Sequence, residues 1–211
     1  LNYTTIKVGG QTEYFAEPTN VSELENILKW ASDKNINCQI FGAGSNLLIS
    51  ENIWKGLFIC TKKLKALNLN PETGILEAES GVMLPTISNL LAKNSCKGGE
   101  WSIGIPGTVG GAIFMNAGYG DFSISKHLVS VKVIDIETFN IFNISKNDLN
   151  FKYRFSPFQK NKLIILSAKF YFEPGGDKHT ITKITKANLK KKTDSQPYHQ
   201  PSFGSVFKNP D

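Results

Sequence analysis

One arginine in the second half of the chain is a candidate for chemistry with an anion. Arg154 is the only arginine among 211 residues, and aromatic residues at positions 153, 155 and 158 surround it in the sequence. An arginine stays charged and binds carboxylates through its planar fork of donors. Partial exclusion of water by the aromatic neighbours would strengthen that charge at a reacting group. The sequence therefore predicts either a stabiliser of developing negative charge or an arginine paired structurally with a nearby acid.

A serine near the end of the chain is a candidate proton donor. Ser205 lies in residues 204–210, which read Gly-Ser-Val-Phe-Lys-Asn-Pro. A hydroxyl is a weak acid, but one held beside a substrate carbon and backed by Lys208 or an ordered water can deliver a proton. The run lacks the Gly-x-Ser-x-Gly pattern of a nucleophile elbow. We therefore consider Ser205 a proton donor and not a nucleophile of that type.

A glycine-rich stretch, residues 104–118, is suited to close contact with a ligand. It holds five glycines and no charged side chain. Glycines make it a poor ordinary helix, and Ile113, Phe114 and Met115 make it a poor solvent loop because they are expected to be buried. Backbone that approaches a ligand closely, with N–H groups free for anionic oxygens, fits this composition. A bound dinucleotide or phosphate is one interpretation, and a glycine-rich bend between core elements is the other.

A second glycine-bearing turn, residues 42–47, follows a predicted strand at residues 37–41. It is not the dinucleotide fingerprint G-x-G-x-x-G, because Leu47 occupies the third glycine position and no long helix follows. Consecutive N–H groups, the Ser45 hydroxyl and the Asn46 amide could still form an anion-binding nest. The alternative is a plain turn between two strands.

The elements that must position these candidates are short strands and three helices. Apolar runs predict strands at residues 14–17, 37–41, 56–60, 64–69, 75–78, 127–135, 139–144 and 163–172. Asn20 and Glu23 are typical of a helix start, and apolar residues at positions 21, 24, 27, 28 and 31 form one stripe of that helix. A second helix is predicted at Leu84–Lys93, with Pro85 in its first turn.

The charge balance favours an anionic ligand over a nucleic acid. The chain has 24 Lys and Arg against 18 Asp and Glu, a net charge of +6, which suits either a polyanion such as a nucleotide or a generic basic surface. A single arginine is unusual for nucleic-acid readout. The basic segment 179–192, with a thin apolar face of Ile181, Ile184 and Leu189, is therefore predicted as a solvated helix rather than a nucleic-acid arm.

The cysteines and histidines predict neither a metal site nor a disulfide framework. Cys38, Cys60 and Cys96 are far apart and form no Cys-x-x-Cys pair. They are typical of reduced thiols in a cytoplasmic protein. The three histidines share no metal-binding spacing, and no apolar run reaches the roughly 18 residues of a membrane span.

Taken together and in order, the motifs closely resemble the UDP-N-acetylenolpyruvoylglucosamine reductase family over nearly the whole chain. The matching motifs are Thr4-Thr5 with Gly9-Gly10, residues 42–47, Gly104-Ile105-Pro106-Gly107, Gly110-Gly111, residues 115–118, Tyr153-Arg154-x-Ser156-x-Phe158 and residues 204–210. The resemblance implies an α+β fold, namely an FAD-binding domain of the vanillyl-alcohol-oxidase (PCMH) type with two α+β subdomains. We expect these at residues 1–62 and 63–176, with the beginning of a substrate-binding domain at residues 177–211.

The resemblance also implies the reaction. In the family, NADPH reduces a non-covalently bound FAD, and the flavin reduces UDP-N-acetylglucosamine enolpyruvate to UDP-N-acetylmuramate for peptidoglycan synthesis. The implied protein is a cytoplasmic monomer that uses no metal and has neither a membrane nor a nucleic acid as partner.

By the same resemblance, functional residues can be assigned. Arg154 would polarise the substrate carboxylate and Ser205 would protonate the neighbouring carbon. Residues expected to bind substrate are Tyr153, Lys208 and Asn209. Residues expected to bind FAD are Gly42, Ala43, Gly44, Ser45, Asn46, Leu47, Gly107, Thr108, Gly110, Gly111, Asn116, Ala117 and Gly118.

The chain departs from the family pattern in ways that shape these expectations. The family's glutamate near the C-terminus has no counterpart before Asp211, so we expect a truncated substrate domain with poor flavin binding or turnover. Arg154 and Ser205 are close in sequence, as in the subclass that lacks a substrate-covering tyrosine loop. Lys192 stands where the family has an arginine, which could weaken a phosphate contact. Two rival interpretations are another flavin enzyme of the same fold and a non-catalytic nucleotide- or nucleic-acid-binding module.

Overall fold

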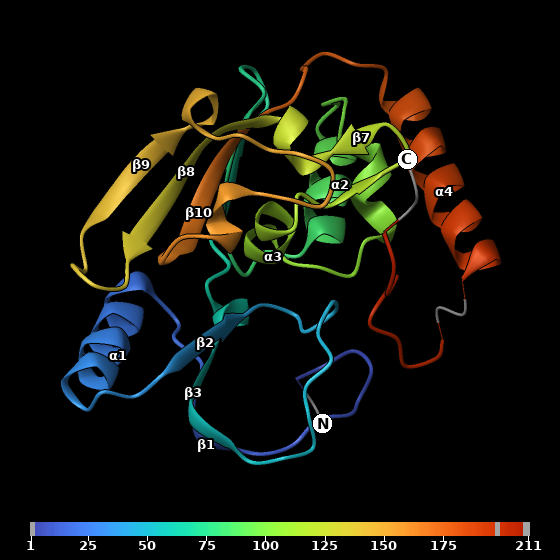
Figure 1. The fold of residues 1–211 in the computed structure, drawn as a ribbon. Helices are drawn as coiled ribbons and strands as arrows, with labels where there is room; N and C mark the ends of the chain where they lie inside the picture. The colour runs from blue at the N-terminus through green and yellow to red at the C-terminus, as the bar shows by residue number, and fades with distance from the viewer. Residues whose placement is uncertain (1–2, 197–198, 209–211) are drawn as a thin grey trace.

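The structure, a computed structural model, describes residues 3–196 and 199–208 and contains two main β-sheets (Figure 1). The first is a three-stranded parallel sheet in the order β1-β3-β2. Its strands are β1 (Thr12–Ala16), β2 (Cys38–Phe41) and β3 (Trp54–Cys60). The strands predicted at 14–17, 37–41 and 56–60 are confirmed within a few residues at their ends.

Helix α1 (Val21–Asp33) forms as its start signal predicts. The Asn20 side chain accepts a hydrogen bond from the Glu23 backbone N–H at 2.8 Å, which satisfies a donor that the first helical turn leaves free. The Glu23 carboxylate accepts from the backbone N–H of Thr19 at 2.7 Å, one residue before the position that a capping box requires. Three residues of the predicted stripe are buried: Leu24, Leu28 and Ala31.

The second sheet has five antiparallel strands in the order β4-β5-β10-β8-β9. They are β4 (Leu67–Asn70), β5 (Ile75–Glu79), β8 (Leu128–Asp135), β9 (Ile141–Ser145) and β10 (Leu163–Tyr171). The strands predicted at 64–69, 75–78, 127–135, 139–144 and 163–172 are therefore confirmed within a few residues at their ends, and β4–β5 and β8–β9 form hairpins. A small ribbon of β6 (Gly118–Tyr119) and β7 (Phe122–Ser123) stands apart from this sheet.

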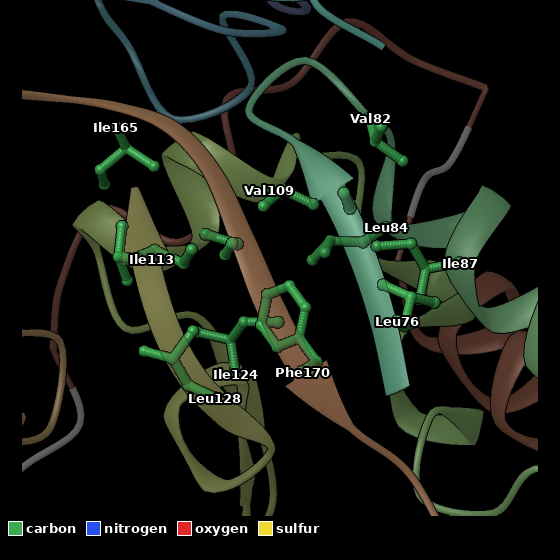
Figure 2. Packing of buried hydrophobic residues seen from close by; sticks show 14 of the residues in the cluster. Leu76, Val82, Leu84, Ile87, Val109, Ile113, Ile124, Leu128, Ile165 and Phe170 are labelled. Carbon is green, nitrogen blue, oxygen red and sulfur yellow. The ribbon is translucent and has the colours of Figure 1, made fainter. Parts of the chain in front are cut away.

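The main core lies between the second sheet and the helices α2 (Leu84–Lys93) and α3 (Val109–Phe114) (Figure 2). Phe170 of β10 is fully buried there, with Leu76, Leu84, Val109 and Ile113 in the same cluster. Because successive strand residues point to opposite faces, other residues of β10, Ile164 and Leu166, lie in a different cluster on the other side of the sheet.

That second cluster joins the two sheets. Ile164 and Leu166 of β10 pack in it with Leu24 of α1 and with Leu57 and Ile59 of β3. The first sheet, α1 and the five-stranded sheet thus share one apolar layer. This layer holds the two predicted subdomains against each other, so the surfaces between them are positioned by buried contacts.

The glycine-rich stretch departs from expectation because part of it is helical. Six of its residues form α3, and Phe114, expected to be buried, is 42% exposed. Gly110 explains the helix: its backbone N–H donates to the Ser80 carbonyl at 2.8 Å, and a Cβ on Gly110 would lie 2.9 Å from the Ser80 Cβ. Close packing on the end of β5 stabilises a helix that propensity alone does not favour.

Helix α4 (Lys178–Ser195) is the basic helix of the sequence analysis, and it is longer than predicted. Its predicted apolar face is only partly correct, because Ile181 is buried while Ile184 is 44% exposed and Leu189 is also exposed. Thr185 takes the second buried position. One edge of α4 packs on α2 and on the 3₁₀-helix η2 (Glu100–Gly104), and the rest faces solvent (Figure 1). Across the described residues, no helix is long and apolar enough to cross a membrane.

Candidate functional site

The two glycine-bearing segments, residues 42–47 and 104–118, meet in space. A Cβ on Gly42 would lie 2.1 Å from the Thr108 Oγ1, and a Cβ on Gly107 would lie 3.6 Å from the Ser45 Oγ. A distance of 2.1 Å leaves no room for a side chain, so glycine is required at position 42 for packing alone. The loop that follows β2 is therefore in direct contact with the start of α3.

The loop 42–47 is held from behind by the N-terminal segment. Gly44 has φ +63° and a Cβ there would lie 2.2 Å from the Tyr3 carbonyl oxygen, so glycine is required by both conformation and space. The Thr5 backbone N–H donates to the Gly44 carbonyl at 3.2 Å. Within the described residues, the backbone N–H groups of Ala43, Ser45 and Asn46 donate no hydrogen bond. These unused donors are what an anion-binding nest provides.

Two buried polar atoms of the glycine-rich stretch also lack partners among the described residues. They are the Thr108 Oγ1, which lies against Gly42, and the Asn116 Oδ1. Asn116 is 7% exposed, has φ +43°, and donates from its Nδ2 to the Lys152 carbonyl at 2.8 Å. Buried polar groups are nearly always satisfied, so unpaired atoms beside a glycine-lined contact fit a missing polar ligand. A dinucleotide such as FAD offers the phosphate and ring oxygens and nitrogens to complement them.

Arg154 lies at the C-terminal end of the glycine-rich stretch, where its guanidinium Nη2 donates to the Gly118 carbonyl at 3.2 Å. The guanidinium also lies over the Tyr153 ring, 5.0 Å from its centroid. The Ser156 hydroxyl and the Gln159 amide both donate to the Phe114 carbonyl, at 2.7 and 2.8 Å, which anchors this loop to the C-terminus of α3. Arg154 forms no ion pair with any acid in the described part of the chain. The structural-pair interpretation is therefore not supported, and the charge is available to a ligand.

A second cation shares this region. The Lys192 ammonium donates to the Gly104 carbonyl at 3.0 Å and lies 5.4 Å from the centroid of the Tyr119 ring. Burial lowers the pKa of Lys192 below its usual value, and the positive charge of Arg154 lowers this pKa further. Lys192 and Arg154 are neighbouring cations, and neither forms an ion pair in the described part of the chain, so they create a region of positive potential that an anionic group would stabilise.

The segment that carries Ser205 lies beside the loop 42–47. The Ser202 backbone N–H donates to the Thr5 carbonyl at 3.2 Å, and Thr5 is the residue that also binds Gly44. A Cβ on Gly204 would lie 3.7 Å from the Ser45 carbonyl oxygen. The structure therefore brings Ser205 to the glycine loop although the two are far apart in sequence.

Among the predicted catalytic and substrate-binding residues, Tyr153, Ser205 and Lys208 face solvent. Ser205 and Lys208 are exposed, and the intervening Phe207 is 85% exposed. Tyr153 is 51% exposed. Among the described residues no hydrogen bond joins Ser205 to Arg154 or to Lys208, and Asn209 lies outside those residues.

Three residues at the site were not found from the sequence. Tyr119 lies beneath Lys192, and Gln159 and Asn188 donate to backbone carbonyls near the glycine-rich stretch. Glutamine and asparagine on these elements carry no local signal. The described residues contain no group of three or more His, Cys, Asp or Glu that could hold a metal ion.

Comparison with known proteins defines the class. A family model described as an FAD binding domain matches residues 12–140. The chain therefore contains the flavin-binding fold that carries both glycine segments and belongs to an FAD-dependent oxidoreductase.

Individual relatives of high sequence identity define the family. The chain is 59% identical over 209 residues to the UDP-N-acetylenolpyruvoylglucosamine reductase of Prochlorococcus marinus subsp. pastoris, covering 99% of this chain and 71% of the relative. It is 43% identical over 210 residues to the enzyme of the same name from a Synechococcus strain, covering 100% of this chain and 70% of the relative. The chain belongs to the UDP-N-acetylenolpyruvoylglucosamine reductase family.

Solved structures agree with this assignment. The crystal structure of UDP-N-acetylenolpyruvylglucosamine reductase from Thermus caldophilus matches with a TM-score of 0.79 at 27% identity, covering 99% of this chain and 72% of that chain. An alkyldihydroxyacetonephosphate synthase matches with a TM-score of 0.59 at 17% identity, covering 76% of this chain and 34% of that chain. The latter similarity shows the shared fold alone.

Proposed function

We propose that this chain reduces UDP-N-acetylglucosamine enolpyruvate to UDP-N-acetylmuramate with FAD bound between residues 42–47 and 107–118 and with NADPH as the reductant. The observation that carries the proposal is the contact between Gly42 and Thr108. Among the described residues, the N–H groups at positions 43, 45 and 46 donate no hydrogen bond, and the buried Thr108 Oγ1 has no partner. The loop at Gly42, Ala43, Gly44, Ser45, Asn46 and Leu47 would bind the pyrophosphate. Gly107, Thr108, Gly110, Gly111, Asn116, Ala117 and Gly118 would line the flavin.

When bound, FAD supplies the transfer of a hydride that originates on NADPH to the methylene carbon of the enolpyruvyl ether. The electron pair of the double bond then moves toward the neighbouring carbon and its carboxylate. Arg154 would bind that carboxylate and stabilise the charge that develops, since it forms no ion pair with an acid among residues 3–196 and 199–208.

The Ser205 hydroxyl would donate the proton that the neighbouring carbon needs, which completes the addition of hydride and proton across the double bond. A neutral donor is suited to this step because it does not repel the charge on the carboxylate. Tyr153, Lys208 and Asn209 would bind the remainder of the substrate. The contacts of residues 202–204 with Thr5 and the loop 42–47 support a position of Ser205 close to the cofactor.

The proposal includes the organisation and location of the protein. We assign residues 1–62 and 63–176 to the two flavin-binding subdomains and residues 177–211 to the beginning of the substrate domain. The protein is proposed to be a cytoplasmic monomer. Cys38, Cys60 and Cys96 are all free thiols, which supports a reducing compartment.

A visible absorption spectrum of the purified protein, before and after denaturation, tests the cofactor assignment. We expect flavin absorption bands and release of FAD into the supernatant on denaturation. Anaerobic NADPH should then bleach the bands, and the enolpyruvyl substrate should restore them without oxygen. A protein that binds no added FAD would refute the cofactor assignment, and bleached flavin that only oxygen restores would identify a different enzyme of the same fold.

A further inference from the structure

Helix α4 directs two polar side chains at the segment that leads into the flavin site. The Asn188 Nδ2 donates to the Glu100 carbonyl at 3.1 Å, and the Lys192 ammonium donates to the Gly104 carbonyl at 3.0 Å. Residues four apart lie on the same face of a helix, so both side chains extend from one edge of α4. Their acceptors are the first and last residues of η2 (Glu100–Gly104).

The segment held in this way continues directly into the proposed flavin site. Three residues after Gly104 comes Gly107, which faces the Ser45 hydroxyl across the contact between the two glycine segments. The Gly107 carbonyl accepts a hydrogen bond from the Leu84 backbone N–H at 2.9 Å, so α2 fixes the other end of this short stretch. Helix α4 therefore helps to position η2, the element from which residues 105–107 continue.

The position of Lys192 is unfavourable for the free energy of the folded protein. Its ammonium is partly buried, has Arg154 as a like-charged neighbour, and forms no ion pair among the described residues. A surface lysine such as its neighbour Lys191 avoids these costs by remaining exposed. Burial of a cation beside another cation destabilises the folded protein unless favourable contacts of that cation compensate. The Gly104 carbonyl and the Tyr119 ring are the contacts that it makes.

We propose that Lys192 and Asn188 are positioning residues for the flavin: they fasten the beginning of the substrate domain to η2 and so fix residues 104–107 against the cofactor. The inference rests on the proposed function, because it requires FAD at residues 107–118. Neither side chain needs to touch the reacting atoms. Lys192 contributes more than Asn188 to fixing this segment, since hydrogen bonds from charged groups are stronger than those from neutral amides.

The test compares Lys192→Met, which keeps the length of the side chain and removes the charge and donor, with Lys192→Arg and with Lys191→Met as an exposed control. For each purified protein, FAD affinity, the visible spectrum of the bound flavin and the melting temperature of the flavin-free protein are measured without substrate. We expect Lys192→Met to weaken FAD binding by about tenfold and to change the flavin spectrum. Lys192→Arg should restore both, and Lys191→Met should match the parent protein.

Two results would overturn the inference. One is a Lys192→Met protein with the parent's FAD affinity and spectrum. The other is a loss of affinity that merely follows a lower melting temperature of the flavin-free protein. If Lys192→Met fails to fold, Asn188→Ala decides the matter: a smaller loss of FAD affinity with an altered spectrum supports positioning, and an unchanged protein refutes it. If the parent protein itself binds no FAD, the proposed function fails instead, so the two failures are distinguishable.

Discussion

The contact between residues 42–47 and 107–111 differs sharply from the segment 202–208 that carries Ser205. In the first region, packing dictates the residue type: a Cβ on Gly42 would lie 2.1 Å from Thr108 Oγ1, and one on Gly44 would lie 2.2 Å from the Tyr3 carbonyl. In the second region, Ser205 and its neighbours are exposed, and Phe207 is 85% exposed. Packing within the described chain therefore explains Gly42 and Gly44, whereas it places no comparable constraint on Ser205.

The difference predicts two kinds of mutational effect. Substitutions at Gly42 or Gly44 should alter folding and cofactor binding together, because a Cβ at either position meets packed atoms of the fold. Substitutions in residues 202–208 should alter a reaction step and leave stability unchanged.

The largest effect is expected for Ser205→Ala. Loss of the proton donor should slow reoxidation of the reduced flavin by the enolpyruvyl substrate by about 10²–10⁴-fold. Reduction of the flavin by NADPH should remain at the parent rate, because it does not need this proton. Stopped-flow absorbance of the two half-reactions measures both rates, and equal loss in both would mean that Ser205 has a structural role.

Arg154→Lys should lower turnover by about 10²–10³-fold, although the charge is retained. Lysine is a point charge without the planar fork, so it loses bidentate contact with a carboxylate and the bond to Gly118. Both residues have a Cβ, so the φ of +51° at position 154 strains them equally and cannot account for a difference. Steady-state kinetics with a thermal melt as control provide the measurement, and unchanged kcat/KM would remove Arg154 from the mechanism.

Gly42→Ala should destabilise the protein by about 1–3 kcal/mol through overpacking and should reduce its bound FAD. The added Cβ meets the Thr108 Oγ1 first, so Thr108→Ala as a second substitution should recover part of the melting temperature. Gly107→Ala is the matched comparison, since the nearest atom to its Cβ is 3.6 Å away and the flavin-free fold should tolerate it. Should Gly42→Ala melt like the parent protein, the packing requirement argued above would be wrong.

The smallest effect is expected from His127, whose protonation should make the free energy of unfolding depend on pH. The ring is stacked on Phe172 with centroids 4.6 Å apart, and burial lowers the pKa of His127 below 6.5. The unfolded chain therefore binds the proton more readily, so the free energy of unfolding should fall as pH drops from about 6.5 toward the folded-state pKa. Urea unfolding across this range should show that slope, and His127→Phe should flatten it. An identical slope in both proteins would assign the acid sensitivity elsewhere.

Much of the fold could be predicted because its signals are local. The helix start at Asn20 and Pro85 in the first turn of α2 are each specified by a few neighbouring residues, and the strands by short apolar runs. The candidate site could be predicted in part. The motifs identify residues 42–47, Arg154 and Ser205 as candidates, but they contain no information on which of these lie together.

The order of elements and the family to which the motifs belong follow from the amino-acid sequence. Three features depend on tertiary packing: six residues of the glycine-rich stretch are helical, Gly42 meets Thr108, and Lys192 binds the Gly104 carbonyl. The physical reason is sequence separation. Propensity, capping and hydrophobic period act over a few residues, whereas these contacts join distant segments and arise only when the shared core packs the two sheets together.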